Sequence, residues 1–279
     1  GLKEAEAFGV TCLSYDFDFK AVAARKNAVV EQLRGGVEGL LGHKNITLVR
    51  GKASFKDAHT VTVIPSEVEG PLQEYTADYI IIATGSVSAS LPIPGADLPG
   101  ILTSREILDI EKVPQRLCVI GGGVIGLEFA SVFRSFGSEV TVVEYCKDIL
   151  PRFDTDLAKR LKQSLGKRGI EINTQAQVTS ISETDGEYTV SYLRKGKEES
   201  VSADKVLMAV GRKANLASLN LADIGVEFTP RGIVVNDVMQ TNLPHIYAVG
   251  DINGRMMLAH AATFQGIVAL DHIIDQNLD

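Results

Sequence analysis

Three glycines and one glutamate have the types and the spacing to hold a charged ligand. Gly121, Gly123 and Gly126 follow a short apolar stretch, and Glu144 ends the next one. In this pattern the first glycine permits a tight turn, the second lets a diphosphate approach the backbone, and the third lets a helix pack closely on the strand. Backbone N–H groups at the start of that helix then complement the diphosphate charge, so the segment predicts a dinucleotide site.

Glu144 extends this chemistry to a ribose. It stands 18 residues after Gly126, where a carboxylate at a strand end can accept hydrogen bonds from ribose hydroxyls and would repel a ribose phosphate. No arginine follows it closely, and Lys147 is the only cation nearby. The unit therefore predicts NAD rather than NADP. The glycine pattern alone is a weak signal, because ligand-free turns of this kind also occur, but strand, helix and acid agree here.

The elements that must position these residues are expected along the same stretch. Residues 117–120 predict a strand, the glycines open a helix, and a second strand ends at Glu144. A nucleotide-binding layer with an added β-meander is the expected result. The later elements of this layer are a helix over about 155–168 and strands over 171–173, 176–182, 187–193 and 204–210.

The flanking residues predict a second group of elements. Prolines and glycines crowd residues 92–100, which is typical of a domain connection and indicates a boundary near Val113. The apolar run 79–83 predicts a strand buried on both faces. The remaining elements are a helix from Asp16 or Asp18 to about Leu41, β segments such as 46–50 and 60–64, a capped helix at Thr103–Ile110, a hairpin near 226–236, a strand at Ile246–Val249 and a helix from about Ala259 to Ile274.

Composition narrows the class of protein. With 279 residues, 45% of them hydrophobic, the chain can form one large or two ordinary domains. No apolar run reaches the roughly 18 residues of a spanning helix, which predicts neither membrane insertion nor secretion. The net charge of −7 argues against a nucleic-acid partner. Cys12, Cys118 and Cys146 have no metal-ligand or redox spacing, so we expect no metal site and a reducing, cytoplasmic location.

Four motifs occur in a recognisable order. They are the glycine unit, Ile-Ile-Ile-Ala-Thr-Gly-Ser at 80–86, Ala-Val-Gly-Arg at 209–212 and Ile-Tyr-Ala-Val-Gly-Asp at 246–251. In this order the chain resembles, over essentially its whole length, the dihydrolipoamide dehydrogenase family of FAD- and NAD-dependent disulfide reductases. The resemblance implies an α/β fold in which a doubly wound NAD-binding domain (113–240) is inserted in an incomplete FAD-type α/β domain (1–112, with a return at 241–279).

The resemblance also implies two sets of cofactor contacts. Taken alone, Gly85 could merely end a strand, Asp251 could cap a turn, and Glu128 could be an ordinary helix-surface residue. The set implied for NAD is Gly121, Gly122, Gly123, Val124, Ile125, Gly126, Leu127, Glu128, Glu144, Ala176 and Gly211. The set implied for FAD is Thr84, Gly85, Ser86, Asp251, Met257, Leu258, Ala259 and His260.

Other parts of the family pattern have no counterpart in this sequence. Family members carry an N-terminal glycine-rich turn for the FAD diphosphate, a Cys-x-x-x-x-Cys pair and a C-terminal His-Pro-Glu segment, and none of the three occurs here. Cys118 is expected to be a small buried hydrophobe, and His245 and His260 are poor substitutes for a catalytic base. We therefore expect a central fragment of a longer protein that binds NAD, does not retain FAD, holds no catalytic residue and is inactive alone.

For the longer parent protein the resemblance implies oxidation of dihydrolipoamide to lipoamide through a disulfide and FAD, with reduction of NAD to NADH. It also implies a homodimer that can serve 2-oxoacid dehydrogenase complexes. Two alternatives remain open: a related flavoprotein such as a mercuric reductase, NADH oxidase or soluble transhydrogenase, and a non-catalytic module that binds NAD. The strand at 79–83, short of neighbours, is expected to pair with another chain.

Overall fold

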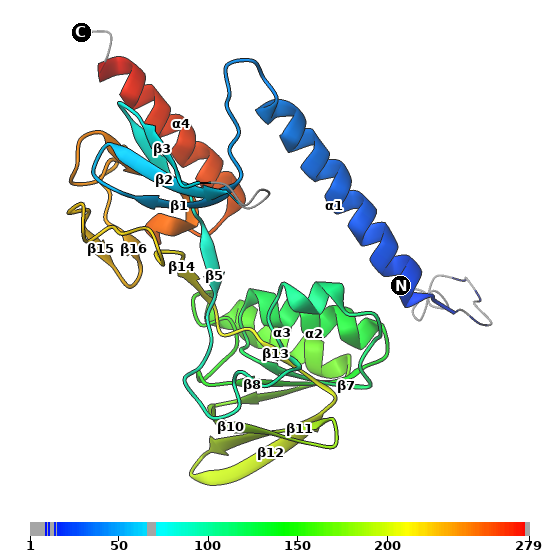
Figure 1. The fold of residues 1–279 in the computed structure, drawn as a ribbon. Coiled ribbons are helices and arrows are strands. Elements are labelled where there is room, and N and C mark those ends of the chain that lie inside the picture. The colour runs from blue at the N-terminus through cyan, green and yellow to red at the C-terminus, as the bar shows by residue number, and fades with distance from the viewer. Residues whose placement is uncertain (1–8, 10, 12–13, 15, 66–70, 277–279) are drawn as a thin grey trace.

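The computed structural model describes residues 9, 11, 14, 16–65 and 71–276. Cys12 lies outside these residues. Figure 1 shows two bodies joined by β5 (Ser86–Ser88) and β14 (Arg212–Ala214), which pair antiparallel. One body carries the glycine turn, and the other carries the motifs at 80–86 and 246–251.

The first body is built on a parallel sheet of five strands. Its order is β6 (Ile101–Leu102), β13 (Lys205–Met208), β7 (Arg116–Ile120), β8 (Glu139–Glu144) and β9 (Ile170–Thr174). The helix α2 (Val124–Ser135) connects β7 to β8, and α3 (Thr155–Lys167) lies between β8 and β9 in the chain. The expected α/β fold with strand, glycine turn, helix and strand is confirmed.

Helices cover only one face of this sheet. The other face carries the antiparallel meander of β10 (Ala176–Thr184), β11 (Glu187–Arg194) and β12 (Lys197–Ala203) (Figure 1). Strand β12 is missing from the sequence-based expectation. Its sequence, KEESVSA, is mostly polar, and its outer residues face solvent, so it lacks the apolar pattern of a strand.

Strand β7 is buried on both faces. Leu117 and Val119 pack in the core below the helices, while Cys118 and Ile120 pack against the meander. Side chains alternate across a strand, so a strand between two covered faces must be apolar throughout. This explains the unbroken apolar run, and it confirms Cys118 as a small buried hydrophobe.

The second body surrounds a parallel pair, β4 (Ile80–Ile82) and β17 (Ile246–Ala248). Ile82, Ala214, Leu221 and Ile246 share its main core. The short helix η3 (Gly250–Asn253) and the helix α4 (Ala259–Gln276) follow β17. The remaining strands are β1 (Gly51–Phe55), β2 (Thr60–Pro65) and β3 (Gln73–Thr76) in one antiparallel sheet, and the expected hairpin of β15 (Phe228–Thr229) and β16 (Gly232–Ile233).

The strand expected at 46–50 is wrong. Residues 46–50 are not in a strand, and Ile46 and Leu48 are exposed. The strand begins instead at Gly51, which pairs with Pro65. A side chain at Gly51 would overlap the Ile64 carbonyl oxygen, so the glycine that looks like a break is required inside the strand.

Two further expectations need correction. The helix expected at Thr103–Ile110 is only the single 3₁₀ turn η2 (Glu106–Asp109), because the backbone is already extended at Ile110, with φ −69° and ψ 143°. The strand at 79–83 is present as β4 but is not buried on both faces. Ile81 is 37% exposed, so the face of β4 from which it points is not fully covered by the described residues.

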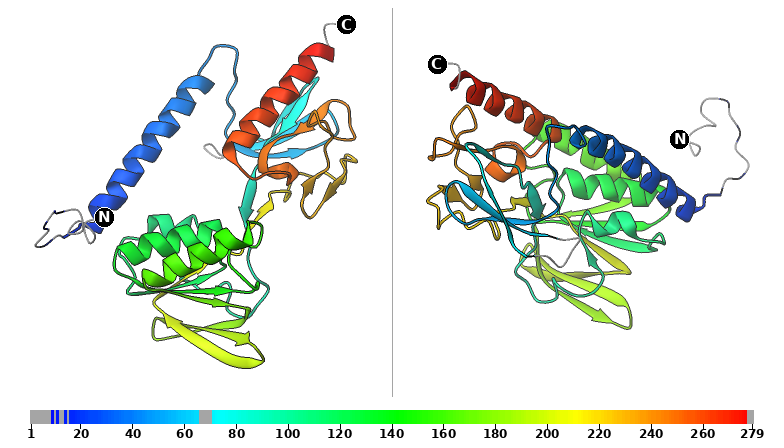
Figure 2. Two further views of the ribbon diagram at one scale, coloured as in Figure 1. Left: turned by 180° about the vertical axis from the view of Figure 1, so that it is seen from behind. Right: turned by 45° about the horizontal axis from the view of Figure 1, so that its top comes forward.

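The first helix, α1 (Phe19–Leu41), begins as expected after Asp18, whose carboxylate accepts hydrogen bonds from the Lys20 and Ala21 amides. Its apolar stripe covers no core, since none of the residues of α1 is buried. The helix contacts the first body in its N-terminal part, through the rings of Phe19 and Phe136 and through the ion pair of Lys26 with Asp109, 3.0 Å apart. Figure 2 shows α1 running from beside the first body toward the level of the second body, to which a loop connects it.

Packing divides the chain at β5 and β14. Strand β6 belongs to the first sheet although it precedes Val113, and Ala214, Leu221 and Ile233 pack in the second body although they precede residue 240. The boundaries near 113 and 240 stay predictions.

Candidate functional site

Two glycines of the turn are required by close backbone packing. Gly121 has φ +112°, and a side chain there would overlap the Ala209 carbonyl oxygen. A side chain at Gly126 would overlap the Gly121 carbonyl oxygen and lie 3.1 Å from Val119 Cγ1. Glycine therefore lets the strand turn sharply and lets α2 pack directly on that turn.

Gly123 differs from these two glycines because its surroundings are open. It is the N-cap of α2, with extended backbone angles and no side-chain cap, and a side chain built there meets nothing within 4 Å. The first amides of α2 therefore face space rather than a capping side chain. A helix start with this geometry can receive a diphosphate.

Glu144 closes the site from the end of β8. Its side chain is only 7% exposed. One carboxylate oxygen accepts the Gly122 amide at 2.5 Å, and the other accepts the Cys146 amide at 2.6 Å. Each oxygen keeps a second acceptor site for a ribose hydroxyl. The carboxylate is thus held rigidly beside the glycine turn.

The strand order brings the predicted NAD contacts to one edge of the sheet. Gly211 and Gly123 follow the neighbouring strands β13 and β7, and Glu144 ends β8. The strand order reverses at β7. Ligands of open α/β sheets bind at such a reversal. Val124, Ile125 and Leu127 lie in the first turns of α2. As ligand contacts all of these positions stay predictions.

Two members of the NAD set, Glu128 and Ala176, remain to be placed. Glu128 is exposed on α2, and Ala176 is buried at the start of β10, just after β9. Among the described residues, the Glu128 side chain forms no hydrogen bond with Glu144, and the Ala176 methyl group cannot form one. Their assignment rests on the family resemblance.

The flavin-type residues gather at the corresponding edge of the second body. Because β4 and β17 are parallel neighbours, the segments after them lie together. The Ser86 hydroxyl donates a hydrogen bond to the Asp251 carboxylate at 2.5 Å. Gly85 has φ +70° and nothing within 4 Å of a built side chain, so this edge has room for a ligand. Thr84 precedes this turn. Met257 and Leu258 come directly before α4, and Ala259 and His260 are its first residues.

Arg212 is a polar residue at this edge to which sequence reasoning assigns no role. Its guanidinium donates to the Ser86 hydroxyl and to the Ser86 carbonyl oxygen, both at 2.7 Å. It lies 4.0 Å from the Asp251 carboxylate. In the sequence it is the last residue of the Ala-Val-Gly-Arg motif at 209–212. The three side chains connect β5, β14 and η3, where the two bodies meet.

A buried amide holds the turn that carries Asp251. The Gln265 side-chain oxygen accepts the Gly250 amide at 2.7 Å and the Asn253 side-chain amide at 2.8 Å. Gln265 and Asn253 are both buried, so these hydrogen bonds are protected from water. The link from α4 to η3 thereby fixes the backbone on which Asp251 stands.

The described cysteines, Cys118 and Cys146, are both free thiols. Burial raises the pKa of the Cys118 thiol to about 12, and partial burial followed by the Glu144 carboxylate raises the pKa of Cys146. The His245 ring stacks on that of His59 with centroids 3.9 Å apart. Among the described residues no three His, Cys, Asp or Glu side chains are grouped to hold a metal ion.

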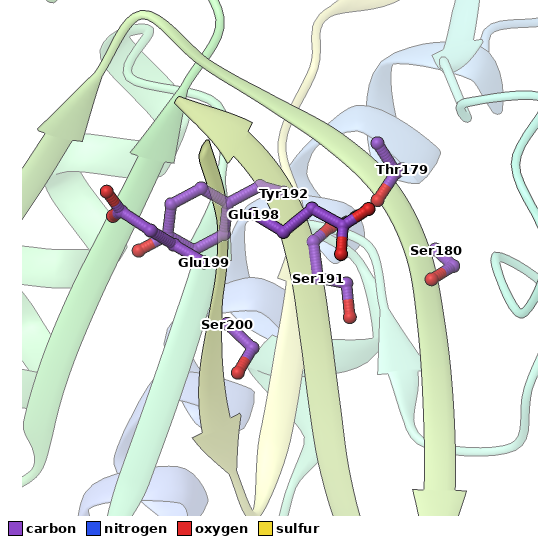
Figure 3. A pocket seen from close by; sticks show the side chains of 7 residues that line it. All are labelled: Thr179, Ser180, Ser191, Tyr192, Glu198, Glu199 and Ser200. Atoms are coloured by element: carbon purple, nitrogen blue, oxygen red, sulfur yellow. Dashed lines mark hydrogen bonds between the residues drawn. The ribbon is translucent and has the colours of Figure 1, made fainter. Parts of the chain in front are cut away.

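A separate hollow of about 380 Å³ lies between the strands of the meander (Figure 3). Its lining is polar, and it contains none of the predicted site residues. The lining residues are Thr179, Ser180, Ser191, Tyr192, Glu198, Glu199 and Ser200.

Comparison with known proteins identifies the family. The model of the pyridine nucleotide-disulphide oxidoreductases matches residues 3–266. The chain belongs to this family. Among curated oxidoreductases, the dihydrolipoyl dehydrogenase of Acholeplasma laidlawii is 38% identical over 98% of this chain and 79% of its own length. That of Bacillus subtilis is 37% identical over 97% of this chain and 58% of its own length.

A solved structure supports the same membership. The copper(II) complex of a mutant of RclA, an HOCl-induced flavoprotein disulfide reductase from Escherichia coli, has a TM-score of 0.85 and 30% identity. The alignment covers 98% of this chain and 59% of RclA. The chain thus spans little more than half the length of several family members. In its described part, no helix combines the length and the apolar character needed to cross a membrane.

Proposed function

We propose that this chain is the NAD-binding part of a dihydrolipoyl dehydrogenase. The observation that carries the proposal is the buried Glu144 carboxylate held on the Gly122 amide, beside the open start of α2 at Gly123. These groups provide acceptors for ribose hydroxyls and N–H donors for a diphosphate. The additional ribose phosphate of NADP would be repelled by this negatively charged carboxylate, so the site favours NAD over NADP.

In the parent protein we propose that FAD contacts the second body at Ser86 and Asp251. Gly85 leaves room there, and the Asp251 carboxylate is 25% exposed and can accept a ligand hydroxyl. When bound, the flavin supplies electron transfer between a disulfide and the nicotinamide. In this proposal the residues of this chain hold and orient the two cofactors. The redox disulfide, the homodimer and the role in 2-oxoacid dehydrogenase complexes are proposed for the full-length parent protein.

Calorimetry with the purified chain tests this proposal. We expect NAD to bind, NADP to bind at least about tenfold more weakly, and Glu144→Ala to lose most of the NAD affinity, since a charged hydrogen-bond acceptor is removed. Glu139→Ala, an exposed carboxylate at the start of the same strand, is the matched control. Absence of NAD affinity, or equal affinity in the Glu144 variant, would refute the NAD assignment.

FAD retention is a separate question that absorption spectroscopy answers. We propose that the chain does not retain FAD, because its sequence contains no second glycine-rich turn for the FAD diphosphate. Visible flavin absorption after purification would contradict this proposal.

A location in the cytoplasm also stays a prediction.

A second candidate is a flavoprotein reductase with another substrate, and the similarity to RclA favours it. Turnover by the full-length protein separates the two candidates. Oxidation of dihydrolipoamide coupled to NADH formation supports the first, and inactivity with dihydrolipoamide together with reduction of another acceptor supports the second. A protein that binds NAD but turns over none of these substrates would be a non-catalytic module.

A further inference from the structure

Asn253 and Gly254 form the one Asn-Gly pair in the sequence. In such a pair the glycine amide nitrogen can attack the side-chain carbonyl carbon of the asparagine, because glycine has no side chain to hinder the approach. The new C–N bond closes a succinimide ring, and the side-chain nitrogen takes up the proton of the glycine amide and leaves as ammonia. Water then opens the ring to an aspartate or an isoaspartate.

The fold requires both residues of this pair. Gly254 has φ +67°, and a side chain there would overlap the Arg231 carbonyl oxygen, so only glycine fits. Asn253 is 7% exposed, and its side-chain nitrogen donates to the Ala248 carbonyl oxygen at 3.0 Å and to the Gln265 side-chain oxygen at 2.8 Å. Packing therefore keeps a chemically labile pair at the end of η3.

Hydrogen bonds restrain the reacting atoms in the folded chain. The Asn253 side-chain oxygen accepts the Arg255 amide at 3.0 Å, while its side-chain nitrogen is bonded to β17 and α4. The Gly254 amide donates to the Asp251 carbonyl oxygen at 3.1 Å. Ring closure needs the side chain to rotate and the Gly254 amide to turn toward it, which breaks these hydrogen bonds. The reaction therefore requires local opening of η3.

The product does not fit the place of the Asn253 side chain. An ionised carboxylate has no hydrogen to donate, yet it would face the Ala248 carbonyl oxygen and the Gln265 side-chain oxygen, which are both acceptors. Gln265 cannot turn its own nitrogen toward the carboxylate without losing the hydrogen bond from the Gly250 amide at 2.7 Å. A turn that has opened and reacted is thus unable to close as before.

We propose that Asn253 is a deamidation site that native packing protects, and that its reaction irreversibly disables the turn bearing Asp251. The inference does not depend on NAD binding, since Asn253 lies in the second body. Each local opening of η3 exposes the pair to reaction. The second body would then lose the edge at which FAD is proposed to bind, while the glycine turn of the first body stays intact.

Peptide mass spectrometry tests the protection. Digests of the purified chain after incubation in mildly alkaline buffer report the change from amide to acid at each asparagine. In urea we expect Asn253 to deamidate at least about tenfold faster than in the folded chain, because the rate follows the population of opened turn. Asn27, an exposed asparagine of α1 that precedes alanine, is the internal control and should react far more slowly. Equal Asn253 rates in both conditions, or no reaction in urea, would overturn the proposal.

A variant of the buried glutamine tests how the turn is protected. Gln265→Ala removes one acceptor of the Asn253 amide, so it should speed deamidation of the folded chain about tenfold and leave the rate in urea unchanged. Gln276→Ala, at an exposed glutamine of the same helix, is the matched control. An unaltered folded-state rate in Gln265→Ala would overturn this account of the protection. If Gln265→Ala does not fold, the wild-type comparison still decides.

The product itself is mimicked by Asn253→Asp. Limited proteolysis should cut the second body of this variant faster than that of the wild type, while the first body keeps its resistance. Asn27→Asp, at the exposed position of α1, is the control and should leave the second body unaffected. A second body in Asn253→Asp that resists proteolysis as well as the wild type would show that the reaction does not disable the turn.

Discussion

At Gly121 and Gly126 the backbone approaches its surroundings so closely that no side chain fits, whereas Gly123 faces open space. The three glycines of one motif therefore have two kinds of role. The first and third allow the strand, turn and helix to pack, and these contacts exist without any ligand. The middle one leaves the start of α2 uncovered, which matters only when a ligand approaches it.

Substitution separates these roles. Gly126→Ala should destabilise the chain by about 1–3 kcal/mol, because its methyl group overlaps the Gly121 carbonyl and presses on Val119. Gly166→Ala on α3, where a side chain meets nothing within 4 Å, is the control and should stabilise by about 0.5 kcal/mol. Urea unfolding measures both changes. A Gly126 variant as stable as the wild type would contradict the packing argument.

Gly123→Ala should show the opposite pattern. Its backbone angles, φ −78° and ψ −179°, suit alanine, so the melting temperature should stay within a few degrees of the wild-type value. The added methyl group stands where the diphosphate is proposed to approach, so NAD affinity should fall about tenfold or more. Calorimetry and thermal unfolding of the same sample test this. Loss of folding with this variant would mean that Gly123 is structural.

At the scale of elements, β7 is the centre of the first body. The helices cover one of its faces, and the meander covers the other. The ion pair of Arg116 with Asp204, 2.6 Å apart, links the start of β7 to the residue that connects β12 with β13. The glycine turn follows the last residue of β7, so packing on both faces fixes the position of the site.

Burial of Cys118 in β7 predicts a dependence of stability on pH. The folded thiol has its pKa raised to about 12 and stays neutral, whereas the thiol of the unfolded chain ionises near its ordinary value of about 8.5. The stabilising contribution is therefore complete below that ordinary value and is lost as the pH rises toward about 12. Between about pH 8 and pH 10 it should fall by about 2 kcal/mol.

Urea unfolding at these two pH values, with Cys118→Ala as comparison, isolates the contribution of this thiol. The cavity left in Cys118→Ala lowers the free energy of unfolding by the same amount at both pH values, and the variant has no thiol to ionise. Its free energy of unfolding should therefore decline less steeply over the same interval. Equal declines for both chains would show that the Cys118 thiol is not protected from ionisation.

At the scale of the whole molecule, the second body and α1 expose much apolar surface. Leu40 on α1 is 75% exposed, Phe264 on α4 is 68% exposed, and Ile81 lies on β4, which pairs only with β17 among the described strands. Soluble monomers rarely leave so many large apolar side chains uncovered on neighbouring helices and strands. An exposed strand edge adds unpaired backbone groups that another chain can bind.

We therefore expect the purified chain to associate with copies of itself through the edge of β4 and the exposed face of α4. Light scattering should give a mass above that of one chain, and Ile81→Lys should reduce it. Leu157→Lys, at a 63% exposed position on α3 in the first body, should leave the association unchanged. A monomer at all concentrations would rule out this expectation.

The sequence by itself determined the unit from Arg116 to Glu144, because strand, turn and helix there are consecutive and each follows from local periodicity and glycine geometry. Only the tertiary structure decided which distant segments meet. Ser86 and Arg212 are 126 residues apart, yet they share two hydrogen bonds, and Ile101 and Leu102 join a sheet whose next strand begins at Lys205. Such contacts depend on pairing between distant segments, and neither segment contains a local sequence pattern that identifies its partner. For the same reason the sequence alone does not reveal that the apolar stripe of α1 covers no core, or that a strand begins at Gly51.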